Sequence, residues 1–224
     1  MRIKWLGHAA FYLEVGGLKF LVDPWLNNPA YRSRPEDFTD VDFIVVTHDH
    51  GDHLGDAIEV LKVAQKARIV SIYEIASYVG EQVGVNRAIG ANIGGPIKLG
   101  SELTAVLTPA LHSSIRGAPV GVVIIAGGES LYHAGDTGVS YDMKLVGELY
   151  KPKVALLPIG GHFTMGPREA ALAADLIRPK YVIPMHYGTF PILWGTPQEF
   201  VEEVRRRGLG IEVVVLKPGD EVSL

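Results

Sequence analysis

The stretch VVTHDHGDHLGD (45–56) constrains the fold of this chain more than any other part of the sequence. It holds three histidines and three aspartates and overlaps the end of the apolar run VDFIVV (41–46). A continuous apolar run of this length is typical of a buried strand. A solvated turn after such a strand would not require so many histidines. The fold must therefore place a loop rich in potential metal ligands at the end of a strand.

The spacing within this loop is H-x-H-x-D-H, formed by His48, His50, Asp52 and His53. In an extended loop, residues two apart point to the same side, so His48 and His50 can converge on one ion while Asp52 and His53 face a second position. Imidazole and carboxylate suit zinc, manganese or iron. The competing interpretation, a polar loop in which Asp52 or Asp56 caps the next helix, explains one aspartate and no histidine.

Composition narrows the classes of protein and of metal site. The chain has 224 residues, of which 47% are hydrophobic and 21% charged, enough for one large domain with a substantial core. Its formal net charge of −4, without a Lys/Arg block, argues against nucleic-acid and membrane partners. The absence of cysteine excludes disulfides, thiolate nucleophiles and sulfur-bound zinc, so a metal site must use histidine and carboxylates.

The N-terminal segment MRIKWLGHAAFYLEVGG (1–17) lacks the apolar core and cleavage site of a signal peptide. No apolar run approaches the ~20 residues that a membrane helix needs. We therefore expect a soluble, cytoplasmic protein.

The order of elements predicts sheets packed together with helices outside. Short strands fill the first third, where Gly16-Gly17 indicates a hairpin, and helices alternate with strands in the last third. No linker divides the chain, so we expect one domain over 1–224, with 24–40 as an irregular, lid-like loop. Strands are expected at 2–8, 10–15, 18–23, 41–46, 68–72, 97–100, 103–110, 120–128, 130–136, 153–159, 180–186 and 211–217, and helices at 56–67, 73–84, 141–149, 167–177 and 197–207.

Three further candidate ligands, His112, Asp136 and His186, each end a later predicted strand. Taken singly each is a weak signal, because a lone histidine near a strand end is more often structural. Together they supply one group each at the same end of successive strands, after a dense His/Asp motif. We therefore predict that they complete a site for two ions.

The ordered motifs resemble the metallo-β-lactamase superfamily, and within it the small stand-alone branch related to ascorbate-6-phosphate lactonase. The motifs that carry the resemblance are FLVDPWL (20–26), THDHGDH (47–53), His112, HAGDTG (133–138) and PMHYG (184–188). The segment 158–191 is the most specific part of the match. The resemblance implies an α/β protein with a four-layer αβ/βα sandwich and metals at one edge between two sheets.

Carried over residue by residue, the resemblance implies a first ion held by His48, His50 and His112. It implies a second ion held by Asp52, His53 and His186, with Asp136 bridging both and Asp23 supporting the site through hydrogen bonds. The implied cofactors are two divalent ions, with zinc or manganese ahead of iron or nickel.

The function expected from this site is dinuclear metal-dependent hydrolysis of a small molecule, in which a metal-bound hydroxide attacks an ester, lactone, amide or phosphodiester. Asp52 would orient the hydroxide, and no protein nucleophile is required. Two alternatives stay open: a non-catalytic metal-binding protein, which would have a closed site, and a nuclease of the same superfamily, for which the chain lacks basic surface. The diiron oxidoreductase branch would need a glutamate ligand and a flavin domain. A homo-oligomer is possible.

Several other residues are candidates for supporting roles. His8 is expected to support the site or face the substrate, and His162, in the turn GGHFTMGP (160–167), is expected to contact the substrate and to act in catalysis with Asp52. His133 is expected to be structural by strand alternation. Aromatic residues near the last ligand, Tyr187, Phe190 and Trp194, could wall a pocket or form a subunit contact. Arg32 and Arg34 are expected to be solvated.

Overall fold

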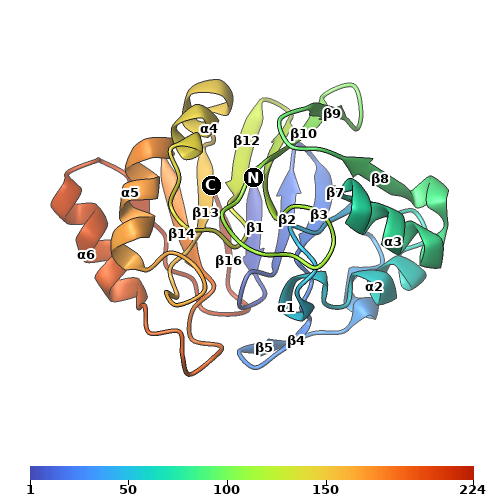
Figure 1. The fold of residues 1–224 in the computed structure, drawn as a ribbon, viewed down its shortest axis with the longest axis horizontal. Coiled ribbons are helices and arrows are strands. Elements are labelled where there is room, and N and C mark those ends of the chain that lie inside the picture. The colour runs from blue at the N-terminus through green and yellow to red at the C-terminus, as the bar shows by residue number, and fades with distance from the viewer.

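The computed structural model describes residues 1–224 and has four layers (Figure 1). Two seven-stranded sheets pack face to face, with α2 (Ala57–Val63) and α3 (Tyr73–Val83) outside the first sheet and α4 (Asp142–Tyr150), α5 (Pro167–Ile177) and α6 (Pro197–Arg207) outside the second. The predicted α/β class and the αβ/βα sandwich are confirmed.

The first sheet has the strand order β16-β1-β2-β3-β6-β7-β8. Pairing is antiparallel from β16 to β3 and parallel from β3 to β8. The strands are β1 (Arg2–Trp5), β2 (Phe11–Val15), β3 (Leu18–Val22), β6 (Phe43–Val45), β7 (Arg68–Ile72), β8 (Ala88–Ala91) and β16 (Glu221–Ser223).

The second sheet has the order β15-β14-β13-β12-β11-β10-β9. Its pairing is parallel from β12 to β15 and antiparallel from β9 to β12. The strands are β9 (Pro96–Lys98), β10 (Leu103–Pro109), β11 (Val120–Ala126), β12 (Glu129–His133), β13 (Val154–Pro158), β14 (Tyr181–Met185) and β15 (Glu212–Val213).

Strand alternation divides the apolar residues between two layers. In β13, Val154 and Leu156 join a cluster of 41 buried residues shared by the two sheets, whereas Ala155 and Leu157 join a cluster of 18 that includes residues of α4, α5 and α6. Successive residues of a strand point to opposite faces, so a strand covered on both faces is apolar throughout. This explains why β13, with the sequence VALLP, contains no polar side chain.

Helix prediction succeeded where the sequence carries clear start and stop residues. Helix α6 begins after Thr196, whose hydroxyl accepts a hydrogen bond from the Glu199 backbone N–H, and Pro197 lies in its first turn. The helix is ended by Gly208, which has a φ of 62°. The predicted helix 56–67 is shorter in the structure, where α2 ends at Val63. A turn of helix that was not predicted, α1 (Gly51–Leu54), precedes it. Gly55, with φ 44°, separates the two.

The segment 24–40 is a folded element rather than the irregular, lid-like loop that was expected. It contains the hairpin of β4 (Asn27–Asn28) and β5 (Tyr31–Arg32) and the 3₁₀ helix η1 (Pro35–Phe38). The buried Asn28 amide donates to Leu6 O at 2.7 Å, and its oxygen accepts the Tyr31 N–H at 2.9 Å. These bonds fasten the hairpin to the turn after β1.

Three edges of the sheets also differ from the prediction. The expected strand 211–217 pairs only over Glu212–Val213, and the strands β8 and β16 were not predicted. A second 3₁₀ helix, η2 (Val85–Arg87), precedes β8. The short edge strand β16 forms because the chain end returns to pair with β1, a long-range event without a local signal. None of the helices has the length and apolarity needed to cross a membrane.

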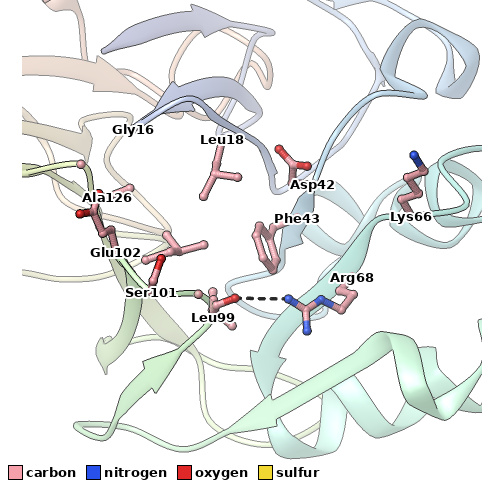
Figure 2. A pocket seen from close by; sticks show the side chains of 13 residues that line it. Gly16, Leu18, Asp42, Phe43, Lys66, Arg68, Leu99, Ser101, Glu102 and Ala126 are labelled. Carbon is pink, nitrogen blue, oxygen red and sulfur yellow. Dashed lines mark hydrogen bonds between the residues drawn. The ribbon is translucent and has the colours of Figure 1, made fainter.

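The two ends of the sandwich are chemically different. One end contains the carboxyl ends of five strands: β3, β6, β10, β12 and β14. The residues that follow these strands therefore lie close together there. At the other end, a hollow of about 500 Å³ lies beside the β2–β3 turn and the start of β6 (Figure 2). Its lining contains Asp42 and Arg68 and none of the predicted ligands.

Candidate metal centre

Three histidines form the first candidate ion position. His48 and His50 lie in the loop after β6, and His112 lies beyond β10. The ring nitrogens that these three residues offer all lie within 4.8 Å of one another, and His48 Nε2 is 3.0 Å from His50 Nδ1. The structure therefore brings together the three residues predicted for the first ion.

A second group lies beside the first and comprises His8, Asp52, His53 and His186, again with ligand atoms within 4.8 Å of one another. Asp136, which follows β12, lies between the two groups. Its Oδ2 is 2.9 Å from His186 Nε2, 3.3 Å from His53 Nε2 and 3.6 Å from His112 Nε2. The structure therefore brings together all seven residues predicted as ligands, with Asp136 between the two groups.

The hydrogen-bond pattern leaves ligand atoms free. His53 Nε2, Asp136 Oδ1 and both ring nitrogens of His186 are buried and have no hydrogen-bond partner. Buried polar atoms are almost always paired, because leaving one unpaired costs about 1–3 kcal/mol. Ring nitrogens and a carboxylate oxygen left unpaired in one cluster fit a cation held between them, so the residues present are compatible with the metal that the resemblance implies.

Asp23 sets the orientation of two of the histidines. This buried carboxylate accepts the Thr47 backbone N–H at 2.8 Å, the Thr47 hydroxyl at 2.7 Å and His53 Nδ1–H at 2.8 Å. Because the single Thr47 proton goes to Asp23, the Thr47 oxygen accepts from His48 Nδ1, which lies 3.0 Å away. Both imidazoles are therefore held through Nδ1, which leaves Nε2 as the ligand atom, a common arrangement around metal sites.

The electrostatics of the site favour positive charge at its centre. Burial disfavours a charged ring, yet the carboxylates of Asp136 and Asp23 raise the pKa of His53 well above its usual value. Burial likewise opposes ionisation of Asp136, but His53 and His186 hold the pKa of that carboxyl well below its usual range. Burial lowers the pKa of His48 to about 3, which keeps this imidazole neutral at physiological pH, the form that binds metal.

His8 contacts Asp52 within the second group. His8 Nε2 lies 3.0 Å from Asp52 Oδ2, and His8 Nδ1 lies 2.6 Å from Thr189 Oγ1. Burial lowers the pKa of His8 to about 4, so the ring is neutral. Since a carboxylate only accepts, Nε2 donates to Asp52 and Nδ1 accepts from the Thr189 hydroxyl.

Asp49 is a site residue to which sequence reasoning gave no role. Its carboxylate accepts from Ser114 Oγ at 2.8 Å, from the Ile115 N–H at 2.7 Å and from Arg116 Nη1 at 2.8 Å. The Arg116 guanidinium in turn lies 3.8 Å from the centre of the Tyr78 ring. Asp49 thereby joins the loop that carries His48 and His50 to the loop that carries His112. In the sequence, only the position of Asp49 inside the dense His/Asp motif indicated that it could belong to the site.

A cavity of about 700 Å³ opens onto the cluster. Its wall combines cluster residues with apolar and aromatic side chains from three separate segments. The lining residues are Trp25, His50, Gly51, Asp52, His112, Ser113, Asp136, Phe163, His186, Phe190 and Ile192. The cluster is thus reachable by a small molecule.

Some predicted residues lie outside this cavity. His162 has an exposed ring that packs edge-on against Phe163 at 4.5 Å, and it is the neighbouring Phe163 that lines the cavity. The left-handed backbone of His162 (φ 61°) belongs to the tight turn after Gly161, and no contact joins its ring to the cluster. The predicted substrate contact and catalytic role of His162 therefore have no geometric support here.

The remaining predicted residues have clear surroundings. His133 Nε2 donates to Ala9 O at 2.9 Å, and its Nδ1 accepts the Gly135 N–H at 3.1 Å, so it braces the turn that leads to Asp136. Trp194 is 60% exposed and does not line the cavity. The exposed Arg32 and Arg34 also lie outside the lining. Neither Asp52 nor Asp56 caps a helix with its side chain.

Comparison with known proteins agrees with this geometry. The family model of the β-lactamase superfamily domain matches residues 19–187. The UPF0173 metal-dependent hydrolase of Hyperthermus butylicus is 53% identical to this chain over 222 residues, and the match covers 97% of each chain. The UPF0173 metal-dependent hydrolase of Caldivirga maquilingensis is 52% identical over 222 residues, and the match covers 99% of this chain and 97% of the relative.

Among solved structures, Igni18, a metallo hydrolase from the hyperthermophilic archaeon Ignicoccus hospitalis, superposes with a TM-score of 0.92 at 45% identity. The match covers 99% of this chain and 97% of Igni18. The isothiocyanate hydrolase from Delia radicum gut bacteria shares the fold, with a TM-score of 0.79 at 19% identity. The chain belongs to the UPF0173 metal-dependent hydrolase family of the β-lactamase superfamily.

Proposed function

We propose that this protein is a dinuclear hydrolase of small molecules. His48, His50 and His112 would hold one divalent ion, Asp52, His53 and His186 a second, and Asp136 would contact both. Zinc or manganese suits this set of imidazole and carboxylate ligands, which also admits iron or nickel. The observation that carries the proposal is the group of buried, unpaired ligand atoms on His53, Asp136 and His186 beside an open cavity.

Ions bound in the cluster would supply two effects, a lowered pKa of a bound water and polarisation of a carbonyl or phosphoryl oxygen. The protein groups supply orientation. The cavity admits the substrate next to Asp52, and the Asp52 carboxylate can accept a hydrogen bond from the attacking water. His8 fixes one oxygen of Asp52 at 3.0 Å, so the other oxygen is left for this purpose. Asp23 holds His53 and, through Thr47, His48.

The two alternatives have less support. A purely structural metal site would be closed to small molecules, and the cavity beside Asp136 and His186 is not closed. A nuclease would need cations for the phosphate backbone, but the cavity lining contains no lysine or arginine, and the net charge is −4.

The test combines metal analysis with a substrate screen. Purified protein is depleted with chelator, reloaded with zinc or manganese, and analysed by plasma mass spectrometry. The reloaded protein is then assayed on lactones, carboxylic esters, amides and phosphodiesters. We expect two ions per chain and hydrolysis that chelator abolishes and metal restores. Two tightly bound ions without hydrolysis of any compound in the panel would instead indicate a structural site.

A further inference from the structure

We propose that the substrate of this site is an uncharged carboxylic ester or lactone that carries an alkyl or aryl group, and that the site rejects phosphorylated substrates. This inference rests on the hydrolytic function proposed above. It depends on the outer wall of the cavity, which takes no part in holding ions.

The inner part of this wall is a preformed aromatic surface. Trp25 and Phe190 stack with ring centroids 5.6 Å apart and an angle of 23° between their planes. His8 meets Trp25 edge-on at 5.1 Å and Phe190 edge-on at 5.4 Å, so the ring that holds Asp52 also supports the stack. An apolar group next to the reacting carbonyl would therefore contact a surface that needs little rearrangement.

Two half-exposed apolar side chains extend this surface outward. Phe163 is 51% exposed and Ile192 is 47% exposed, and they come from the separate loops after β13 and β14. Single exposed apolar residues are ordinary on protein surfaces. These two line a cavity of about 700 Å³ that ends at the cluster, and a ligand filling it would remove their surface from water.

The charges of the cavity argue against an anionic substrate. None of its lining residues is lysine or arginine, and its two carboxylates, Asp52 and Asp136, belong to the cluster. Arg116 is committed to Asp49 at 2.8 Å. A phosphate or carboxylate on the remote part of a substrate would therefore lose water without gaining a partner, which is strongly unfavourable.

The reaction on such a substrate is simple hydrolysis. The oxygen of one water forms a bond to the carbonyl carbon, the acyl C–O bond breaks, and one proton of that water ends on the departing alkoxide oxygen. The products are a carboxylate, formed with release of the second proton, and an alcohol, which remain one molecule when the substrate is a lactone. No oxidant or other co-reactant is needed.

A lactone series tests the proposal. The zinc-loaded protein is assayed with γ-butyrolactones carrying methyl, propyl or hexyl groups at C5, and with the analogue carrying a phosphorylated hydroxymethyl group there. We expect kcat/KM to rise about fourfold for each methylene that enters the cavity, and the phosphorylated lactone to be the poorest substrate. A flat series, or a phosphorylated lactone hydrolysed as well as the hexyl compound, would overturn the proposal.

A charge substitution provides the sharper test. Ile192→Lys, at a half-exposed position that can be changed without disturbing the core, should lower kcat/KM for the hexyl lactone and raise it for the phosphorylated one. Tyr141→Ala removes an aromatic side chain that is 69% exposed on the surface before α4, outside this cavity, and should change neither value. If Ile192→Lys leaves the preference unchanged, this wall does not contact the substrate.

Binding separates this proposal from the proposed function. Calorimetry with the hexyl γ-lactam, which is not readily hydrolysed, should show binding that Phe190→Ala weakens on the order of tenfold or more. If the lactam binds in this way but no compound is hydrolysed, the catalytic function is wrong and the inference about ligand class holds. If lactones are hydrolysed but the lactam binds equally to wild type and Phe190→Ala, the inference about ligand class is wrong.

Discussion

The two ends of the β-sandwich differ in which residues with a Cβ atom adopt positive φ angles. At the end away from the cluster these are Lys151 and Arg178, which cap the carboxyl ends of α4 and α5. The positive φ angles of the tight turns at that end are supplied by Gly16, Gly17, Gly127 and Gly128. At the cluster end, His8, Asp23 and His186 adopt positive φ angles of 52°, 45° and 57°. Such angles are easy for glycine and unfavourable for residues with a Cβ atom.

The difference lies in what surrounds the strained residues at each end. Backbone strain and buried, unpaired polar atoms occur together at the cluster end, where His186 has both. The hollow at the other end is lined by charged groups that are exposed or only half-buried, such as Lys66, Glu102 and Arg68 (Figure 2). Strained and unsatisfied groups persist only where the surrounding structure holds them, and they gather at functional sites. Matched substitutions at the two ends should therefore have unequal effects on function.

The largest effect on activity is expected from Asp52→Asn. This change keeps the shape of the side chain but removes the charge that would hold the second ion and orient the attacking water. We expect kcat to fall on the order of 10²–10³-fold, as when one electrostatic element of a catalytic site is deleted. His133→Gln should leave kcat within a few fold, because the hydrogen bonds of His133 go only to backbone groups. Equal, small effects on metal-loaded protein would mean that the ions are structural.

A smaller effect is expected when the support of the ligands is altered. Asp23→Asn replaces an acceptor of His53 Nδ1–H and should lower metal affinity by about 10–100-fold, measured by competition with a chromophoric chelator. Asp42→Asn is the matched control at the opposite end, since Asp42 Oδ2 accepts the Lys19 N–H at 2.8 Å and contacts no ligand. If both variants bind metal equally well, Asp23 does not orient the ligands.

Arg116→Ala should have a moderate effect on one ion. Its loss leaves Asp49 with fewer partners and loosens the loop that carries His112, so we expect affinity at the first position to fall by about tenfold, or ~1.4 kcal/mol. Arg68→Ala removes a similar guanidinium, 5.1 Å from the centre of the Phe43 ring at the far end, and should not change affinity. A loss of affinity in Arg68→Ala as large as in Arg116→Ala would contradict a local role for Arg116.

The smallest effect on function is expected from Gly17→Ala, which changes a far-end turn. Gly17 has φ 77°, and a Cβ atom there would meet no other atom, so the penalty is conformational strain alone. We expect about 1 kcal/mol of destabilisation, a fall in Tm of ~2–4 °C in a scanning fluorescence melt, and unchanged kcat/KM. A loss of activity at a temperature where the variant is folded would show that the two ends are coupled.

The sequence predicts the layers of this fold better than its edges. Helix α5 (Pro167–Ile177) was predicted with its observed bounds because Pro167 marks its start and its apolar residues follow a helical period. The strand β16 could not be predicted, because it is held by pairing with β1 across the whole chain length. The turn of helix α1 was not predicted, because no local pattern indicated that Gly55, with its positive φ, would separate it from α2.

The candidate ligands could be predicted from their residue types and their positions at strand ends. The residues that hold these ligands in place through hydrogen bonds could not be predicted in this way. Thr189 and Asp49 act through contacts with His8 and with the 114–116 loop, both distant in sequence. His162 was expected at the site because it lies in a Gly-rich turn near the ligands, but the turn presents Phe163 to the cavity instead. Side-chain direction in a tight turn depends on the fold around it, which a single sequence does not reveal.

Anomalous diffraction from crystals of the zinc-loaded protein, recorded above and below the zinc edge, tests the central claim most directly. We expect two peaks, one among His48, His50 and His112 and the other among Asp52, His53 and His186, with Asp136 in contact with both. Ligand distances should be about 2.0–2.3 Å. A single peak, or peaks outside this cluster, would contradict a dinuclear centre.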